Sequence, residues 1–161
     1  MQRALHLGVA ATGLKFPLSR GDYLIRDVLQ LDHEKSVISV GDLLSNGQTV
    51  QFHLRDPDTA GEDLDDMLQR YCRQHPTVDV ASALLFTCTG RGRRFFGHAG
   101  HDSGQFVEHF GDLALGGFFC GGEIAPVGDT TYLHGYTAAI GVFRPKTQAD
   151  SASSAGLEAG V

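Results

Sequence analysis

The chain has 161 residues, of which 42% are apolar and 20% charged, a balance typical of one soluble globular domain rather than a disordered chain. The formal net charge is −6 and the basic residues are scattered apart from Arg91, Arg93 and Arg94, which argues against a nucleic-acid-binding face. No apolar run approaches the roughly 20 residues of a membrane span, and the N-terminus lacks the long apolar core of a signal peptide. We therefore expect a cytoplasmic protein without membrane or nucleic-acid partners, and three widely spaced cysteines agree with that compartment.

The first third of the chain is predicted to form strands. One strand is expected over 3–11, followed by an irregular segment over 13–32 with one short strand or turn near Tyr23–Leu29. A hairpin is predicted over 36–56, because Asn46-Gly47 supplies the positive φ angles of a type I′ turn.

The strand after this turn alternates between apolar and polar side chains. Its apolar face carries Val50, Phe52 and Leu54, and its polar face carries Gln51, His53 and Arg55. His53 and Arg55 are the more informative pair. They either form the solvent face of an edge hairpin or belong to a functional surface.

Two helices are predicted. The first begins at a capping box, in which Thr59 and Glu62 satisfy free amide groups, and it ends at 74–76; its helically spaced apolar residues are Leu64, Met67, Leu68 and Tyr71. Asp102 or Ser103 is expected to cap the second helix, whose buried side would consist of Phe106, Phe110 and Leu113.

The remaining segments are predicted to be strands. The segment 80–88 is too continuously apolar for an edge strand and should lie centrally, while 116–124 and 130–145 read as the last two strands. The order of elements indicates an α+β domain: one mixed, largely antiparallel sheet with two helices packed on one face. The domain is expected to span 1–145, with 146–161 as a disordered tail rich in Ala, Ser and Gly.

The central strand runs into a glycine turn that carries a cation. Gly90 and Gly92 allow the backbone to approach a ligand closely, and Arg91 offers a fork for a carboxylate or phosphate. The alternative is an ordinary turn with a solvated Arg91. The spacing excludes a Walker loop and a dinucleotide fingerprint.

Cysteines and histidines supply further candidates. Cys88 and Cys120 each end an apolar strand, either as small buried hydrophobes or as reactive thiols, for instance Cys120 with His134. A second cluster comprises His98, His101, Asp102 and His109, and there we expect a polar loop rather than a metal site.

Four segments, in this order, carry a resemblance to a known family: "TVQFHLRDPDTAGEDL", "ALLFTCTGRGRRFFG", "GGFFCGGEIAPVG" and "YLHGYTAAIGVF". Together they resemble the C-terminal domain of FIST proteins, named for F-box and intracellular signal transduction, from about Leu7 to Phe143. The resemblance implies a sensory module for small ligands such as amino acids, usually preceded by an N-terminal FIST domain that we expect to lie outside this chain. It implies no catalytic residues.

The preferred hypothesis is a small-ligand sensor. If the strands ending at Cys88 and Cys120 are neighbours, their glycine turns form a shelf of exposed amides. Arg91 would then hold the carboxylate of an amino-acid-like or other small anionic ligand, and Glu123 its ammonium group. Clearance would come from Gly90, Gly92 and Gly121, and His53 and Arg55 would either line the pocket or face a partner domain.

Three alternatives stay open. The domain would be an interaction module of a signalling or ubiquitin-ligase adaptor protein, recognising its partner through the polar face of the hairpin. It would otherwise be an enzyme using Cys88 or Cys120, although we expect no enzymatic activity. The resemblance also implies haem-binding nitric-oxide sensors, for which His53 or His134 would be the axial ligand; no other cofactor is expected.

Overall fold

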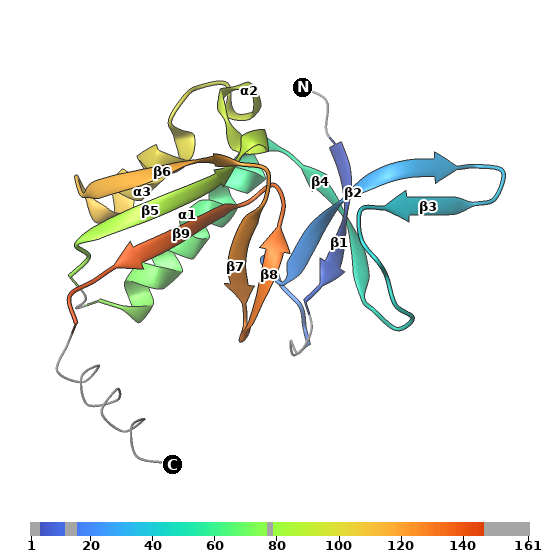
Figure 1. The fold of residues 1–161 in the computed structure, drawn as a ribbon, viewed down its shortest axis with the longest axis horizontal. Helices are drawn as coiled ribbons and strands as arrows, with labels where there is room; N and C mark the ends of the chain where they lie inside the picture. Colours follow the sequence, from blue (N-terminus) through green and yellow to red (C-terminus); the bar gives the residue numbers. More distant parts are fainter. Residues whose placement is uncertain (1–3, 12–15, 77–78, 147–161) are drawn as a thin grey trace, which may run out of the picture.

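The computed structural model describes residues 4–11, 16–76 and 79–146, which form two lobes that lie side by side (Figure 1). The N-terminal lobe consists of β1(Ala4–Ala10), β2(Tyr23–Asp32), β3(Val37–Val40) and β4(Val50–Arg55). The C-terminal lobe consists of α1(Pro57–Gln74), β5(Ser82–Cys88), η1(Thr89–Arg91), α2(Arg93–Phe96), α3(His101–Phe110), β6(Ala114–Cys120), β7(Glu123–Val127), β8(Thr130–His134) and β9(Ala138–Phe143). No helix in the described part of the chain is long and apolar enough to cross a membrane.

The N-terminal lobe is one antiparallel sheet of order β3-β2-β1-β4. The hairpin predicted over 36–56 is therefore wrong, because β3 pairs with β2 and β4 pairs with β1 along almost its whole length. Gly47 does adopt the positive φ expected of a turn, at 91°, but the strands on its two sides have different neighbours. The strand expected near Tyr23–Leu29 is also longer than predicted, since β2 continues to Asp32.

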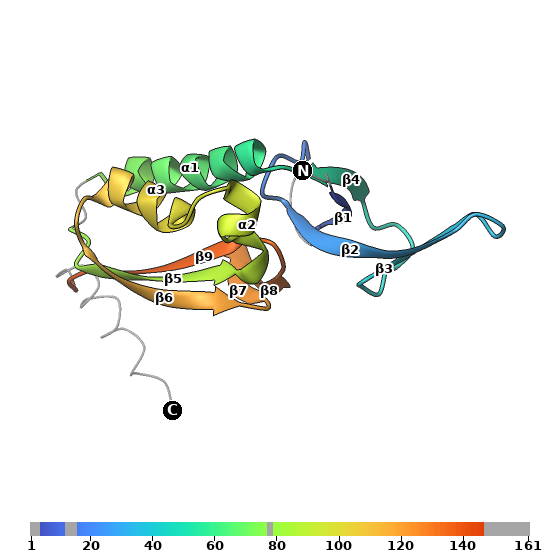
Figure 2. The ribbon, with the colours of Figure 1, turned by 90° about the horizontal axis from the view of Figure 1, so that it is seen from above.

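The C-terminal lobe is built around β5, the middle strand of a β6-β5-β9 sheet, as its apolar sequence predicts. β6 runs parallel to β5, β9 runs antiparallel to it, and α1 and α3 cover one face of this sheet (Figure 2). The core between sheet and helices consists of Leu64, Leu68, Ala83, Leu85, Phe106 and Ala138. The α+β class with two helices on one face is confirmed, with the strands divided among three sheets.

The third sheet arises where the sequence predicts two strands and the structure has four. The segment 116–124 contributes to β6 and β7, and 130–145 contributes to β8 and β9. β7 and β8 form a separate two-stranded hairpin. Tyr136, between β8 and β9, has a φ of 63°, so the backbone turns there instead of continuing one strand. Of the predicted tail, only Lys146 belongs to the described residues.

Both helices begin differently from the prediction. Asp56, rather than Thr59, caps α1: the Thr59 N–H donates to Asp56 Oδ1 at 3.0 Å, and Pro57 takes the first helical position, where its missing N–H costs nothing. α3 starts after Gly100, so Asp102 lies inside the first turn and is free for another role. The predicted buried side of this helix is confirmed, since Phe106 is fully buried and Phe110 packs against the core with Leu113.

Candidate functional site

The structure brings the two glycine turns together at one edge of the β6-β5-β9 sheet. β5 and β6 are parallel neighbours in a register that places Cys88 opposite Cys120. The turn at Gly90–Gly92 and the turn at Gly121–Gly122 therefore leave the sheet side by side. Ligand sites in open α/β sheets form outside the carboxyl ends of parallel strands, and these turns occupy that place.

Arg91 is bound to a carboxylate of its own chain. Its Nε donates to Asp102 Oδ2 at 3.0 Å and its Nη2 donates to Asp102 Oδ1 at 2.9 Å, and only 5% of each side chain is exposed. Nη2 also donates to the Ala60 carbonyl oxygen at 3.2 Å, and the Thr87 hydroxyl donates to Asp102 Oδ2 at 3.3 Å. The guanidinium predicted to bind a ligand is thus a fixed part of the site's wall.

Glu123 lies on the other face of the sheet. Because successive strand residues point to opposite faces, Cys88 points away from the side on which Thr87 contacts Asp102. Glu123 belongs to the Cys120 side: its carboxylate, in a residue only 1% exposed, accepts from Cys120 Sγ at 3.3 Å and from the Thr137 N–H at 3.4 Å. The expected arrangement of Arg91 and Glu123 on opposite sides of one hollow is therefore not present.

The geometry does not activate Cys120 as a nucleophile. Burial raises the pKa of the Cys120 thiol, and the hydrogen bond to Glu123 and the charge of that carboxylate raise this pKa further. A nucleophilic cysteine needs the opposite shift. Cys88 is buried, with its sulfur 3.5 Å from the Gly90 N–H, and the His134 ring lies 2.9 Å from the Ala125 carbonyl oxygen, the only hydrogen bond of that ring among the described residues.

His53 and Arg55 face inward, and the apolar face of β4 faces solvent. Arg55 Nη2 donates to the Gly90 carbonyl oxygen at 2.7 Å, and its guanidinium lies 3.6 Å from the centre of the Phe95 ring. Burial and then the charge of Arg91 lower the pKa of Arg55. The Arg55 side chain thus connects the N-terminal lobe to the glycine turn of the C-terminal lobe.

His53 packs edge-on against Tyr23, with ring centres 5.1 Å apart, and its Nε2 is buried without a hydrogen-bond partner in the described part of the chain. Burial lowers the pKa of His53. Neither His53 nor His134 lines either of the two cavities described below.

A cavity of about 400 Å³ lies on the Arg91 side of the sheet edge. Its floor is the Arg91–Asp102 pair with Leu85 and Thr87 of β5, and its other residues come from the turn after β5, the start of α3 and β6: Gly92, Arg93, His98, Ala99, Gly100, His101, Ser103, Leu115, Gly116, Gly117, Phe118 and Phe119. Of the predicted site residues, only Arg91 and Gly92 line it. We call it the glycine-turn cavity.

The cavity is also lined by Arg93, His98 and His101, none of which the sequence predicts as a ligand-binding residue. Arg93 is exposed, and within the described residues its side chain has no hydrogen bond and no carboxylate within 4.0 Å. His101 stacks on Phe96 at 3.6 Å and its Nδ1 lies 3.2 Å from His98 Nε2; burial lowers the pKa of His101. The sequence feature that could have indicated this site is the basic pair Arg93-Arg94 directly after a glycine turn.

Comparisons with known proteins identify the family of this chain. The family model described as the FIST C domain matches residues 1–126. An uncharacterized protein of Mycobacterium tuberculosis is 38% identical over 143 residues, which are 89% of this chain and 37% of that protein. An uncharacterized Mycobacterium bovis protein is 37% identical over the same shares. An F-box/LRR-repeat protein of Arabidopsis thaliana is 34% identical over 84 residues, which are 50% of this chain and 16% of that protein.

The chain spans a little over a third of the length of the mycobacterial relatives. No solved structure matches it. The family match runs from β1 into β7 and includes the glycine turns, the Arg91–Asp102 pair and every residue of the glycine-turn cavity. The chain therefore belongs to the FIST C domain family of sensory signal-transduction modules.

Proposed function

We propose that this domain senses a small anionic molecule, amino acids included, in the glycine-turn cavity. The observation that carries the proposal is Arg93, a cation at the cavity with no carboxylate partner among the described residues, next to a second cation, Arg91, that its own partner holds rigid. Gly92 and Gly100 leave backbone accessible at the rim, and Phe119 offers an apolar wall. The proposal replaces Arg91 by Arg93 as the group that binds the ligand.

The surroundings of the cavity support sensing rather than catalysis. Neither Cys88 nor Cys120 lines it, so a thiol mechanism has no nucleophile there. The turn that forms its rim also presents the Gly90 carbonyl oxygen to Arg55 of the N-terminal lobe. A ligand that orders this turn would change a contact between the two lobes, and this change would transmit binding to the N-terminal lobe.

A screen of amino acids, small carboxylates and inorganic phosphate by thermal shift, followed by calorimetry, tests the proposal, since a ligand of the native state raises its stability. Arg93→Ala should weaken binding roughly tenfold or more, because a charge-assisted hydrogen bond is worth about 1.5–3 kcal/mol. Arg94→Ala is the matched control: it is the neighbouring exposed arginine and does not line the cavity. Equal affinity of the two variants would exclude Arg93 as the ligand-binding group.

A second candidate function is recognition of another protein or domain, and it rests on the outer face of β4. Val50, Phe52 and Leu54 are 45%, 53% and 58% exposed, and Leu5 of β1 lies in register beside Leu54 on this face. Contiguous apolar surface of this kind marks interfaces. The partner would be a FIST N-terminal domain or a signalling protein.

The second candidate can be tested with the part of the Mycobacterium tuberculosis relative that lies outside the matched 143 residues, prepared as a separate chain. Analytical ultracentrifugation of that chain mixed with the present one should show that the two associate. Phe52→Asp should remove this association. Gln51→Asp, on the opposite face of the same strand, should leave it intact. If the domain does not use this interface, neither the parent chain nor the Gln51→Asp variant associates.

A further inference from the structure

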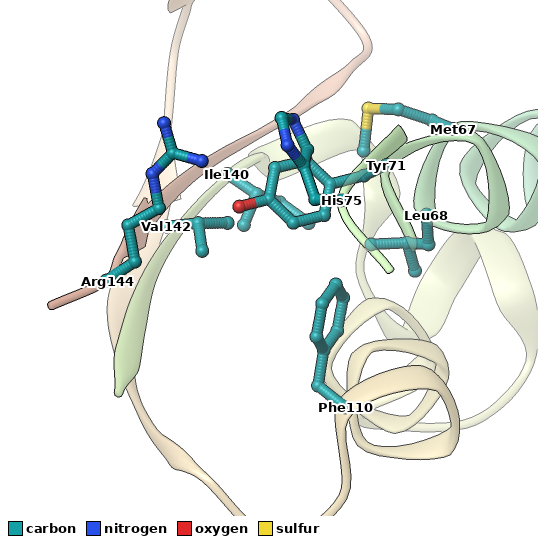
Figure 3. A pocket seen from close by; sticks show the side chains of 8 residues that line it. All are labelled: Met67, Leu68, Tyr71, His75, Phe110, Ile140, Val142 and Arg144. Carbon is teal, nitrogen blue, oxygen red and sulfur yellow. The ribbon is translucent and has the colours of Figure 1, made fainter. Parts of the chain in front are cut away.

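A second cavity lies at the far end of the C-terminal lobe. Its volume is about 300 Å³, and it is lined by Met67, Leu68, Tyr71, His75, Phe110, Ile140, Val142 and Arg144 (Figure 3). Val142 is the register partner of Ala83, near the start of β5, whereas the glycine turns follow the end of that strand. We call it the α1–β9 cavity, and it shares no residue with the glycine-turn cavity.

The walls of this cavity are apolar and already in place. Leu68 is part of the core, and Phe110 and Ile140 pack directly against that core. The ring of Tyr71 lies edge-on to Phe110 at 5.9 Å between centres and contacts the ring of His75 at 4.6 Å. Side chains packed in this way form an apolar surface that needs little rearrangement to receive a ligand.

Three polar groups at the cavity have no hydrogen-bonding or ionic partner for their side chains in the described part of the chain. Arg144 has no carboxylate within 4.0 Å, and neither the Tyr71 hydroxyl nor the His75 ring makes a side-chain hydrogen bond. Figure 3 shows the Tyr71 hydroxyl pointing toward the side of the cavity where Arg144 lies. A guanidinium and a hydroxyl that line the same cavity suit an oxyanion.

Among the described residues, the lining also contains no acidic residue. An ammonium group placed in this cavity would lose water without gaining an opposite charge, so the site favours a plain acid over an amino acid or an amine. At roughly 30 Å³ per water-sized group, the cavity holds about ten non-hydrogen atoms.

We propose that the α1–β9 cavity binds a small monocarboxylate with an aromatic or branched aliphatic body. The carboxylate pairs with Arg144 and accepts from the Tyr71 hydroxyl, and the body packs against Leu68, Phe110 and Ile140. This site is separate from the glycine-turn cavity and does not depend on the function proposed for it.

Calorimetry with 3-phenylpropanoate as the probe tests this proposal on the full chain. The probe should bind saturably, Arg144→Met should weaken binding roughly tenfold or more, and Arg70→Met, an exposed arginine of α1 outside the lining, should not change it. Both substitutions are on the surface and replace the guanidinium by an uncharged, unbranched side chain. Absence of saturable binding, or equal weakening in the two variants, overturns the proposal.

Two further comparisons complete the test. 3-Phenylpropylamine and L-phenylalanine should bind at least roughly tenfold more weakly than the probe, because the lining offers no carboxylate; equal affinity overturns the assigned ligand class. Arg93→Ala should leave probe binding unchanged. If Arg93→Ala rather than Arg144→Met removes binding, the probe occupies the glycine-turn cavity and the α1–β9 site is excluded.

Discussion

Arg91 and Asp102 form a buried bidentate ion pair that joins the glycine turn after β5 to the first turn of α3. α3 starts without a side-chain cap because its N-cap residue is Gly100, and the acidic residue of its first turn, Asp102, is turned toward the guanidinium. It also sets the shape of the glycine-turn cavity, because both residues line it.

Removing one member of this pair should destabilise the folded state strongly. Asp102→Ala leaves a buried guanidinium without its counter-charge and should lower the free energy of unfolding by about 3–5 kcal/mol, measured by urea denaturation. The control is Glu62→Ala, which removes an exposed ion pair with Arg20 (3.4 Å) and should cost no more than about 1 kcal/mol. Similar losses in both variants would mean that the buried pair has no special structural role.

Gly117 of β6 should not tolerate a side chain. Its φ is 148°, and a Cβ there would stand 1.9 Å from the carbonyl oxygen of Leu85 in the neighbouring strand. Gly117→Ala should therefore lower the free energy of unfolding by more than about 2 kcal/mol. Gly121→Ala, where a Cβ meets no atom within 4 Å, should stay within about 0.5 kcal/mol of the parent.

Stability should fall as the pH drops from 7.5 to 5.5. Burial is the first cause that lowers the pKa of His6, His53 and His101 below the ordinary 6.5. The folded state therefore holds these rings neutral, while the unfolded chain binds protons as the pH passes below 6.5. The stabilisation is complete above pH 6.5 and is lost as the pH falls toward the folded-state pKa values.

Urea denaturation across this pH range measures the effect. His6→Gln should make the dependence on pH shallower, because His6 is buried and neither ring nitrogen has a hydrogen-bond partner in the described part of the chain. His33→Gln, at an exposed position, should leave the dependence unchanged. A stability that rises on acidification from pH 7.5 would contradict the assignment.

Cys120 should react slowly with iodoacetamide at neutral pH. Burial and the neighbouring Glu123 raise the pKa of its thiol, so little thiolate is available. In a background with Cys72 and Cys88 replaced by Ser, Glu123→Gln should accelerate alkylation, because it removes the charge that opposes ionisation. An unchanged rate would show that access alone limits the reaction, and fast alkylation of the parent would restore the thiol-enzyme hypothesis.

Much of the fold follows from local sequence signals. The continuous apolar run of β5 predicts its central place in the sheet, and the apolar spacing of α3 predicts the burial of Phe106. The family resemblance is also carried by the sequence, and the family match over 1–126 confirms it. The glycine turns could also be located from the sequence, because glycine at the end of a strand indicates a tight turn of the backbone.

Partners and faces required the tertiary structure. Alternation along β4 is visible in the sequence, but only its pairing with β1 and the packing of Arg55 on Phe95 turn the polar face inward. The sequence places a guanidinium at residue 91 and a carboxylate at residue 123. Asp102 binds Arg91 because α3 folds back over the sheet, and Glu123 lies on the opposite face. Local sequence patterns predict the secondary structure and the burial that each residue favours. A buried charge, by contrast, pairs with whichever opposite charge the folded chain brings to it from distant elements.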